Sequence, residues 1–518
     1  MFQTIIKNGK IIDGTGAVPF AGDVAFDNGE IAEIGDLKKA KAREIVDAAG
    51  KFVAPGFIDI QNHSDVYWTL FEDPGMDSLV GQGITTALIG HCGASLAPLV
   101  SRDSLLAVQK WHNLEGVNFN WVTFKEYLAE LGKRKFGVNI ASLVGYSTMR
   151  RGLIKDDIRA LKDDETKALN KILKKSMEEG AFGLSSGLSY AHEAIMAENE
   201  LFSLARTVKD AGGLFSIHLR SEGAELVESV SEALELVGKF GVNLKISHFK
   251  AREKGNWHLL PQALELIENA YQKHGNVHFD VYPYDFMWEV LYTYLPKWSY
   301  EGGRVSILNN LKGDQQRKKM LAYLASRDIA YPQIFVASAA HSLTASGKTL
   351  GEIAASHNTS SEQALLNIIE NGGSEVMVFD RNLDEKQVRR LYTHPLGIVA
   401  TDGAGFSPNA KKYVHPRCFG TMPKFLSSVL EGGLMPIEKA VQKITSVPAQ
   451  KAGIKRRGQL KKGFCADACV FDACVRDNAS YANPFRFPSG IDYVFVNGGA
   501  AVKNGNLTSG VFGEALRK

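Results

Sequence analysis

Short apolar runs alternate with helix-like segments over most of the chain. The segment 226–237, for example, places Leu226, Val230 and Val237 on one face, the period of a helix packed on a sheet. Eight apolar runs have the length of a buried strand: residues 57–60, 85–89, 138–144, 182–185, 214–218, 244–248, 277–281 and 396–401. Eight repeats of strand and helix predict an α/β fold with a closed parallel (β/α)8 barrel rather than an open doubly wound sheet.

The two ends of the chain have a different pattern. Apolar runs flank Asn-Gly pairs at 8–9, 28–29, 497–498 and 504–505, and this pair accepts the positive φ of tight hairpin turns. We therefore expect residues 1–55 and 455–518 to build one small β-sandwich together, with the barrel at residues 56–454 between them. The last two barrel strands lie more than 100 residues apart, which predicts a subdomain inserted at about residues 285–350 over the barrel mouth.

Potential metal ligands follow several of the predicted strands. Cys92, His218 and His248 each close an apolar run, and Asp402 follows the last one. In a parallel barrel the strand ends converge on one site, and a thiolate with two imidazoles is a natural set for Zn²⁺. Three protein ligands leave a position for water, whose proton Asp402 could take and return to a leaving group.

Other interpretations of the same residues remain open at this point. A histidine at a strand end is often a hydrogen-bonded core residue, and a buried cysteine often behaves as a small hydrophobe. Cys92 as a nucleophile is disfavoured because no oxyanion-loop signature is visible. His91 is left out of the metal site because adjacent strand residues point to opposite sides.

Composition limits the partners and the compartment. The formal net charge is +3, from 60 basic and 57 acidic residues, so nucleic acid or an anionic membrane is not expected as a partner. The chain has no run of about 18 apolar residues and no signal-peptide segment at its start. Five cysteines do not make a disulfide framework in so long a chain. We expect a cytoplasmic protein with a small-molecule substrate, and the oligomeric state stays open.

Nine short motifs follow one another in order along the chain. They are PGFID at 55–59, CG at 92–93 with SLAP at 95–98, GLSY at 187–190, HLRSE at 218–222, SHFK at 247–250, DVYPY at 280–284, DG at 402–403, HPRCFG at 415–420 and PSGIDY at 488–493. Together they resemble the N-acyl-D-amino-acid deacylases (D-aminoacylases) of the amidohydrolase superfamily. The resemblance runs from about residue 3 to about residue 505. It implies a metal-dependent hydrolase barrel that cleaves the amide of N-acyl-D-amino acids.

The resemblance also assigns roles to single residues. It implies that a tightly bound, catalytically required zinc is held by Cys92, His218 and His248, and that Asp402 is the general acid/base. It further implies that three residues hold the α-carboxylate of the substrate. These are Tyr190, Lys250 and Arg417. The chemistry agrees, because lysine and arginine offer charge-assisted hydrogen bonds to a carboxylate.

Two positions depart from the family's pattern. The family often has His-x-His after Asp59 as ligands for a second, weaker metal, but here the first position is Gln61 and only His63 remains. A neutral amide is a poorer zinc ligand than imidazole, so the sequence predicts one tightly bound zinc and at most a weak second position at His63. In addition, Met287 and Trp288 lie where the family commonly has a small hydroxyl residue, which predicts a bulkier and more apolar pocket wall.

Two alternative functions accompany this prediction. A relative that opens a cyclic amide, as dihydroorotases and hydantoinases do, would bridge two metals with a carboxylated lysine, and the departures at Gln61 and Met287 disfavour it. A catalytically silent homologue kept for binding has no chemical need for the metal ligands together with Asp402.

Overall fold

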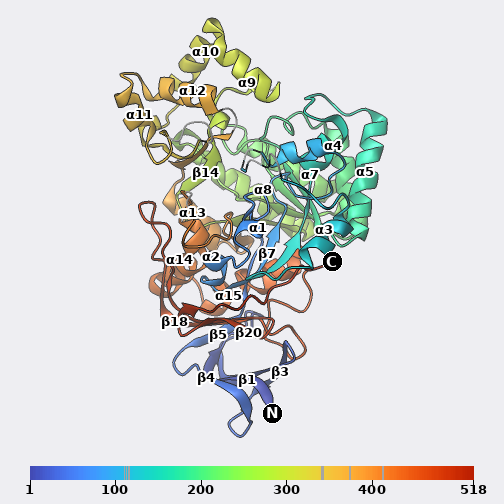
Figure 1. Ribbon diagram of the computed structural model, residues 1–518, viewed down its shortest axis with the longest axis vertical. Coiled ribbons are helices and arrows are strands. Elements are labelled where there is room, and N and C mark those ends of the chain that lie inside the picture. Colours follow the sequence, from blue (N-terminus) through green and yellow to red (C-terminus); the bar gives the residue numbers. More distant parts are fainter. Residues whose placement is uncertain are drawn as a thin grey trace.

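Three parts lie one above another along the long axis of the molecule (Figure 1). Strands from both chain ends lie at one end, the barrel lies in the middle, and a mostly helical insert lies at the other end. The computed structural model describes residues 1–109, 111–112, 114, 117–300, 302–339, 344–372, 375–410 and 413–518. No helix within these ranges is long and apolar enough to cross a membrane.

The middle part is the expected (β/α)8 barrel. Its strands are β6 (Phe57–Asp59), β7 (Ile84–Ile89), β8 (Asn139–Ser142) continued by β9 (Val144–Gly145), β10 (Gly183–Gly187), β11 (Leu214–His218), β12 (Asn243–Ile246), β13 (Val277–Val281) and β17 (Gly397–Val399). Neighbours in this order pair in parallel. The ring closes between β17 and β6, where Asn62 bridges Gly403 and the His63 N–H donates to the Gly403 carbonyl at 2.7 Å.

Helices after the strands cover the outside of the barrel. Helix α7 (Leu226–Phe240) illustrates the cause: Leu226, Val230, Ala233 and Val237 recur at helical spacing and are all buried, whereas Glu228 is not. The other helices of this part are α1 (Thr69–Glu72), α2 (Asp77–Val80), α3 (Phe124–Leu131), α4 (Tyr146–Ile154), α5 (Asp163–Glu178), α6 (Glu198–Asp210), α8 (Leu260–His274), α13 (Glu385–Thr393), α14 (Arg417–Gly432), α15 (Ile437–Lys443) and α16 (Ser446–Ala452).

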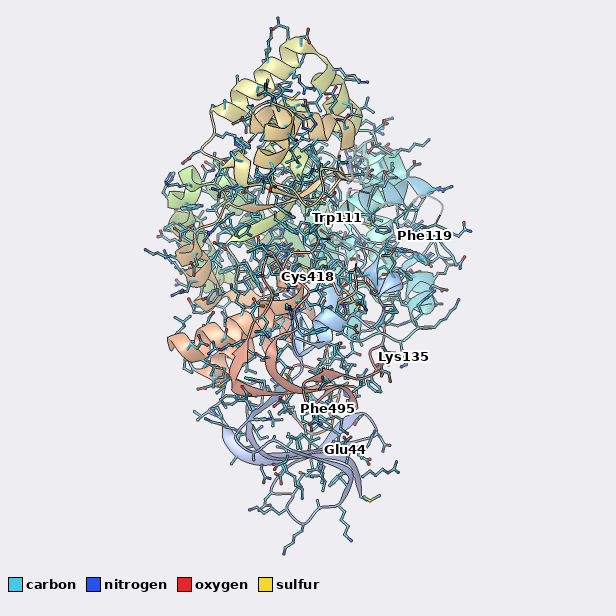
Figure 2. The ribbon with its side chains drawn as sticks, turned by 60° about the vertical axis from the view of Figure 1, so that its left-hand side comes forward. Glu44, Trp111, Phe119, Lys135, Cys418 and Phe495 are labelled. Carbon is cyan, nitrogen blue, oxygen red and sulfur yellow. The ribbon has the colours of Figure 1, made fainter. Side chains whose placement is uncertain are left out.

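The two chain ends share one continuous sheet, whose described strands number nine. These are β1 (Phe2–Ile11), β2 (Phe20–Asp27), β3 (Glu30–Gly35), β4 (Ala42–Asp47), β5 (Phe52–Pro55), β18 (Ala468–Arg476), β19 (Ser489–Val496), β20 (Gly499–Lys503) and β21 (Asn506–Leu507). The link between the two ends is the antiparallel pair β5–β18. Figure 2 shows Glu44 and Phe495, from opposite ends of the chain, in this same part of the molecule.

Side chains alternate between the two faces of these strands, and one face packs against the barrel. Val53 and Phe495 belong to a core made by the terminal strands themselves, whereas Phe52 and Val494, on the other face, belong to the large core shared with the barrel. The last residues of the chain leave the sheet, because Ala515 bridges Ile140 of barrel strand β8.

The insert has a core of its own and extends further than expected. Its antiparallel sheet has the order β14 (Phe286–Val290), β16 (Met377–Arg381), β15 (Phe335–Ser338), and its helices are α9 (Gly303–Lys312), α10 (Asp314–Ala325), α11 (Leu350–Ser356) and α12 (Ser361–Gly372). The insert core runs from Val290 to Phe379, whereas the sequence suggested an end near residue 350. Strand β16 closes the insert by pairing with β14, and no local pattern reveals so distant a pairing.

Candidate metal-dependent active site

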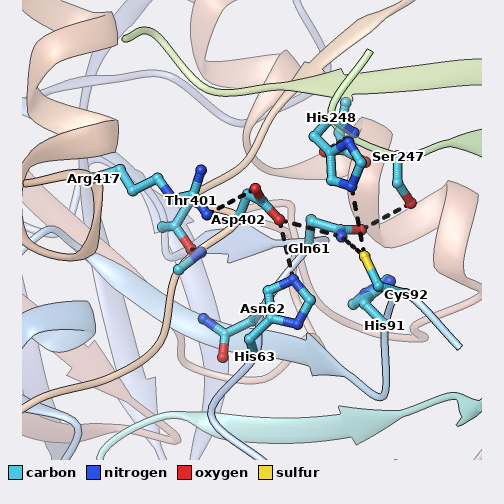
Figure 3. Close-up of polar contacts among 12 residues, drawn as sticks. Gln61, Asn62, His63, His91, Cys92, Ser247, His248, Thr401, Asp402 and Arg417 are labelled. Carbon is cyan, nitrogen blue, oxygen red and sulfur yellow. Dashed lines mark hydrogen bonds and ion pairs between the residues drawn. The ribbon is translucent and has the colours of Figure 1, made fainter. Parts of the chain in front are cut away.

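Three potential zinc ligands meet at the carboxyl ends of barrel strands. Their ligand atoms, from Cys92, His218 and His248, lie within 4.8 Å of one another, and all three residues are buried. The Cys92 Sγ lies 3.5 Å from the His248 Nε2, and Figure 3 shows these two atoms facing each other. The residues come from the ends of β7, β11 and β12, as the barrel geometry led us to expect.

Backbone turns at the strand ends aim these side chains into the barrel mouth. Cys92, His248 and Asp402 all have left-handed backbones, with φ of 53°, 36° and 47°. Such a conformation costs a residue with a side chain on the order of 1–3 kcal/mol and persists where its surroundings enforce it, commonly at functional sites. The backbone of His248 is held by a hydrogen bond from its N–H to the Asp280 Oδ1 at 2.9 Å.

The donor set fits a zinc ion. The Nδ1 of His218 is buried without a hydrogen-bond partner, whereas its Nε2 meets the Ser189 Oγ at 2.8 Å. The Nδ1 of His248 lies 2.9 Å from the Glu222 Oε1, which leaves its Nε2 facing Cys92. This carboxylate–histidine pair is typical of zinc sites.

The thiol of Cys92 also has the form that zinc requires. Burial raises its pKa, but the neighbouring imidazoles of His218, His248 and His63 outweigh burial and hold the pKa well below that of a free thiol. The thiolate is the ligating form of cysteine. His91 stands apart from this cluster, with its Nδ1 3.3 Å from the Ser216 Oγ.

Asp402 lies beside the three ligands between two positively polarised partners. Its Oδ1 is 3.0 Å from the His63 Nε2, and its Oδ2 is 2.9 Å from the Arg417 Nη2 (Figure 3). Burial raises the pKa of Asp402, yet the charges of Arg417 and His248 and the hydrogen bond from His63 hold it well below the ordinary aspartate value. The carboxylate is therefore ionised at neutral pH and available to accept a proton.

One cavity brings together the metal ligands, Asp402, His63 and the residues expected to bind the substrate. It is lined by His63, Tyr67, Cys92, Trp111, Tyr190, His218, Glu222, His248, Lys250, Tyr282, Met287, Trp288, Glu289, Asp402 and Arg417. We call this the active-site cavity. Its last wall comes from Met287, Trp288 and Glu289 of β14, so the insert completes the site that the barrel begins.

The two cations in the cavity differ in how they are held. The Lys250 Nζ donates to the Glu222 Oε1 at 2.6 Å and to the His248 carbonyl at 3.0 Å. The Arg417 guanidinium lies over the Tyr282 ring at 4.6 Å, and its Nε and Nη1 are buried without hydrogen-bond partners. Arg417 thus keeps two donors for a ligand. Tyr190 lies with its ring centroid 5.1 Å from that of His218.

Sequence reasoning missed several residues that contact the site, among them Glu222, Ser189 and Trp111. Glu222 orients His248, and Ser189 contacts His218. Both lie in motifs that were noted, so a search for carboxylates and hydroxyls near each histidine could have found them. Trp111, whose ring stacks on His63 at 6.0 Å between centroids, comes from the segment after β7 and has no sequence signal.

Comparisons with known proteins agree with this geometry. Residues 44–242 match the model of the amidohydrolase family. The chain is 31% identical to a D-aminoacylase of Alcaligenes xylosoxydans xylosoxydans, covering 96% of this chain and 94% of that protein. It is also 31% identical to the N-acyl-D-glutamate deacylase of the same organism, covering 95% of this chain and 92% of that protein.

Solved structures give the same picture. A D-aminoacylase described by its binuclear metal centre, with one-metal activation and second-metal attenuation, superposes with a TM-score of 0.85 at 30% identity, and both chains are fully covered. The N-acyl-D-glutamate deacylase of Bordetella bronchiseptica, in complex with zinc and a phosphonate mimic of the tetrahedral intermediate, superposes with a TM-score of 0.85 at 29% identity, again over both full chains. An L-hydantoinase of Arthrobacter aurescens, at 16% identity and a TM-score of 0.56, shares only the fold.

Proposed function

Because the chain belongs to the D-aminoacylase family of amidohydrolases, we propose that it hydrolyses the amide bond of N-acyl-D-amino acids in a zinc-dependent reaction. The products are a D-amino acid and a carboxylate. The observation that carries the proposal is the meeting of the Cys92, His218 and His248 ligand atoms within 4.8 Å in a cavity that also contains Asp402.

Different residues of the cavity contribute different parts of the proposed reaction. Cys92, His218 and His248 would hold a zinc ion, which would supply Lewis-acid activation of a water molecule and of the amide carbonyl. Asp402 is ionised and takes the proton of the attacking water, then gives it to the leaving amine. Contacts from His63 and Arg417, one to each carboxylate oxygen, fix the direction in which Asp402 faces.

The α-carboxylate of the substrate has a matching cation. Arg417 keeps its Nε and Nη1 without hydrogen-bond partners, and both are buried, so a carboxylate placed beside either atom gains a charge-assisted hydrogen bond. Lys250 adds a second positive charge to the cavity lining, and Tyr190 contributes part of the wall between Trp111 and His218. Fixing both the carboxylate and the scissile amide orients the third substituent of the α-carbon, which is the basis for preferring one enantiomer.

The side chain of the preferred D-amino acid follows from the rest of the wall. Sequence identity does not choose, because the D-aminoacylase and the D-glutamate deacylase are equally similar to this chain. Tyr67, Trp111, Met287 and Trp288 give the cavity an apolar and aromatic wall, and the Glu289 carboxylate beside them is paired with Arg252 at 2.8 Å. Among the described lining residues the lysines and arginines are Lys250 and Arg417. We therefore propose large apolar side chains rather than acidic ones; the side chain of Arg304, another cation of the insert, lies outside the described residues.

The compartment is part of the same proposal. All five cysteines are free, and Cys92 has to remain reduced to bind zinc. A reducing cytoplasm meets both conditions. Cell fractionation with detection of the native protein tests this point.

The deciding experiment is hydrolysis of a panel of N-acetyl-D- and N-acetyl-L-amino acids by protein whose zinc content has been measured. We expect release of the free amino acid from the D-substrates only. Hydantoin and dihydroorotate belong in the same panel. Opening of a cyclic amide with no cleavage of the linear ones would favour the hydantoinase-type alternative. A zinc-loaded protein that cleaves neither would favour the silent homologue.

A further inference from the structure

A buried lysine holds Gln61 in one orientation beside Cys92 and Asp402. The Lys245 Nζ donates to the Gln61 Oε1 at 2.6 Å, and the Ser247 Oγ donates to the same oxygen at 3.2 Å. Lys245 also forms an ion pair with Asp280, and both side chains are completely buried. Since a lysine ammonium only donates, the amide oxygen of Gln61 has to face it.

The opposite end of the Gln61 amide therefore faces the metal ligands with its N–H donors. Its Nε2 lies 3.5 Å from the Cys92 Sγ and 3.4 Å from the Asp402 Oδ1 (Figure 3). A divalent cation between His63, Cys92 and Asp402 would need lone pairs from residue 61. It would meet two N–H bonds instead, with the Lys245 ammonium behind them. The residues present do not fit a second metal.

The contacts of Gln61 place positive charge next to the metal ligands, as a second cation would. The positive end of the Gln61 amide interacts with the thiolate and with the catalytic carboxylate, and its direction is fixed by Lys245. Asp280 joins this arrangement to the metal ligands, because it pairs with Lys245 and also accepts the His248 N–H at 2.9 Å. A lysine this deeply buried is costly unless it is paired, and here two partners compensate the burial.

We infer that Lys245, acting through Gln61, takes the place of the second metal ion, so that the protein binds one zinc and is not inhibited by excess zinc. Lys245 is a positioning residue in this scheme, since it acts through Gln61 and not on the substrate. The inference rests on the zinc centre of the proposed function and does not depend on the substrate. It sets this chain apart from the D-aminoacylase with the binuclear centre, for which second-metal attenuation is described.

Zinc counting tests the inference directly. Purified protein is equilibrated with a large excess of zinc, freed of unbound metal and analysed for zinc per chain, and activity is followed during the zinc titration. We expect one zinc per chain and no loss of activity. Two zinc ions at the mouth, located by anomalous diffraction with His63 as a ligand of the second, would overturn it.

Variants separate the two residues. In Gln61→His the new imidazole still lies next to the Lys245 ammonium, and we expect one zinc. In Gln61→His combined with Lys245→Gln the charge is gone, and we expect a second zinc together with inhibition by excess zinc. Lys451→Gln is the matched control: this lysine is also buried but donates to the Asn276 carbonyl at 3.0 Å, and its loss should leave one zinc.

The variants also provide contrary outcomes. A second zinc in the Gln61→His single variant would show that Lys245 does not exclude the metal. A folded double variant that still binds one zinc would remove Lys245 from the argument. If the unpaired Asp280 prevents the double variant from folding, the zinc count of wild type and of Gln61→His decides. Because zinc is counted without substrate, failure of the deacylation proposal is distinguishable from failure of this one.

Discussion

Two buried carboxylates that line the active-site cavity, Glu222 and Asp402, have the same kinds of neighbours. Each contacts one histidine and one basic side chain at 2.6–3.0 Å. Burial raises the pKa of both carboxyls, and the neighbouring positive charges lower both to well below their ordinary values. The partners are His248 and Lys250 for Glu222, and His63 and Arg417 for Asp402.

Position relative to the metal ligands separates their roles. The Glu222 carboxylate contacts the Nδ1 of His248 and leaves the Nε2 of that ring facing Cys92. Glu222 therefore orients a metal ligand. Asp402 meets the Nε2 of His63 and lies among the ligands themselves, within hydrogen-bonding distance of the Gln61 amide. In the proposed reaction, similar neighbours therefore let Glu222 orient a metal ligand and Asp402 transfer a proton.

Removing the charge of Asp402 should have the largest effect. Asp402→Asn keeps the shape of the side chain but cannot accept a proton, so we expect kcat to fall by roughly 10²–10⁴ while one zinc stays bound. Measurements of kcat and zinc content check this. Asp380→Asn is the control, since Asp380 is a buried carboxylate of the insert bonded to Tyr294 and should be dispensable for activity. Near-normal turnover in Asp402→Asn would exclude it from the reaction.

The equivalent change at Glu222 should weaken metal binding instead. Glu222→Gln keeps an oxygen that can accept from the His248 Nδ1 but loses the negative charge that orients and polarises the imidazole. We expect zinc affinity to drop about 10- to 100-fold, measured by competition with a chelator. Equal zinc affinity in Glu222→Gln and Asp402→Asn would contradict the division of roles.

The two basic partners provide a smaller effect. Lys250→Ala and Arg417→Ala should each cost about 1.5–3 kcal/mol in transition-state binding of substrates with a free α-carboxylate, or roughly 10- to 100-fold in kcat/KM. Both residues also contact an internal carboxylate, so the informative quantity is the ratio of kcat/KM for an N-acetyl-D-amino acid to that for its amide. If that ratio is unchanged in both variants, neither residue binds the carboxylate.

The metal ligands and the surroundings of Asp402 could not be predicted equally well from the sequence. The barrel was confirmed, because each strand is an apolar run with its own boundaries, and a cysteine or histidine at its end is conspicuous. The contacts that distinguish Glu222 from Asp402 were not predictable, since they depend on which nitrogen of each histidine faces which carboxylate.

The other features that the sequence did not predict depend on contacts between residues far apart in the chain. Lys245 lies inside an apolar run, and its partner Asp280 lies on the next strand, so their ion pair exists only once β12 and β13 are side by side. The same reason hid the end of the insert, where Trp288 pairs with Phe379. Gln61 was recognised as a departure, but the lysine that explains it was not.

The preference for the side chain of the substrate should give the smallest effect. It depends on the apolar wall of the cavity and on neither Glu222 nor Asp402. Met287 and Trp288 favour apolar contact. We expect kcat/KM for N-acetyl-D-Phe, D-Met and D-Leu to exceed that for N-acetyl-D-Glu and D-Asp by about tenfold, the scale of modest differences in an apolar pocket. Met287→Lys should shift the preference toward D-Glu while zinc content stays the same. A clear advantage of acidic substrates in the wild type would instead reveal a further cation in the cavity.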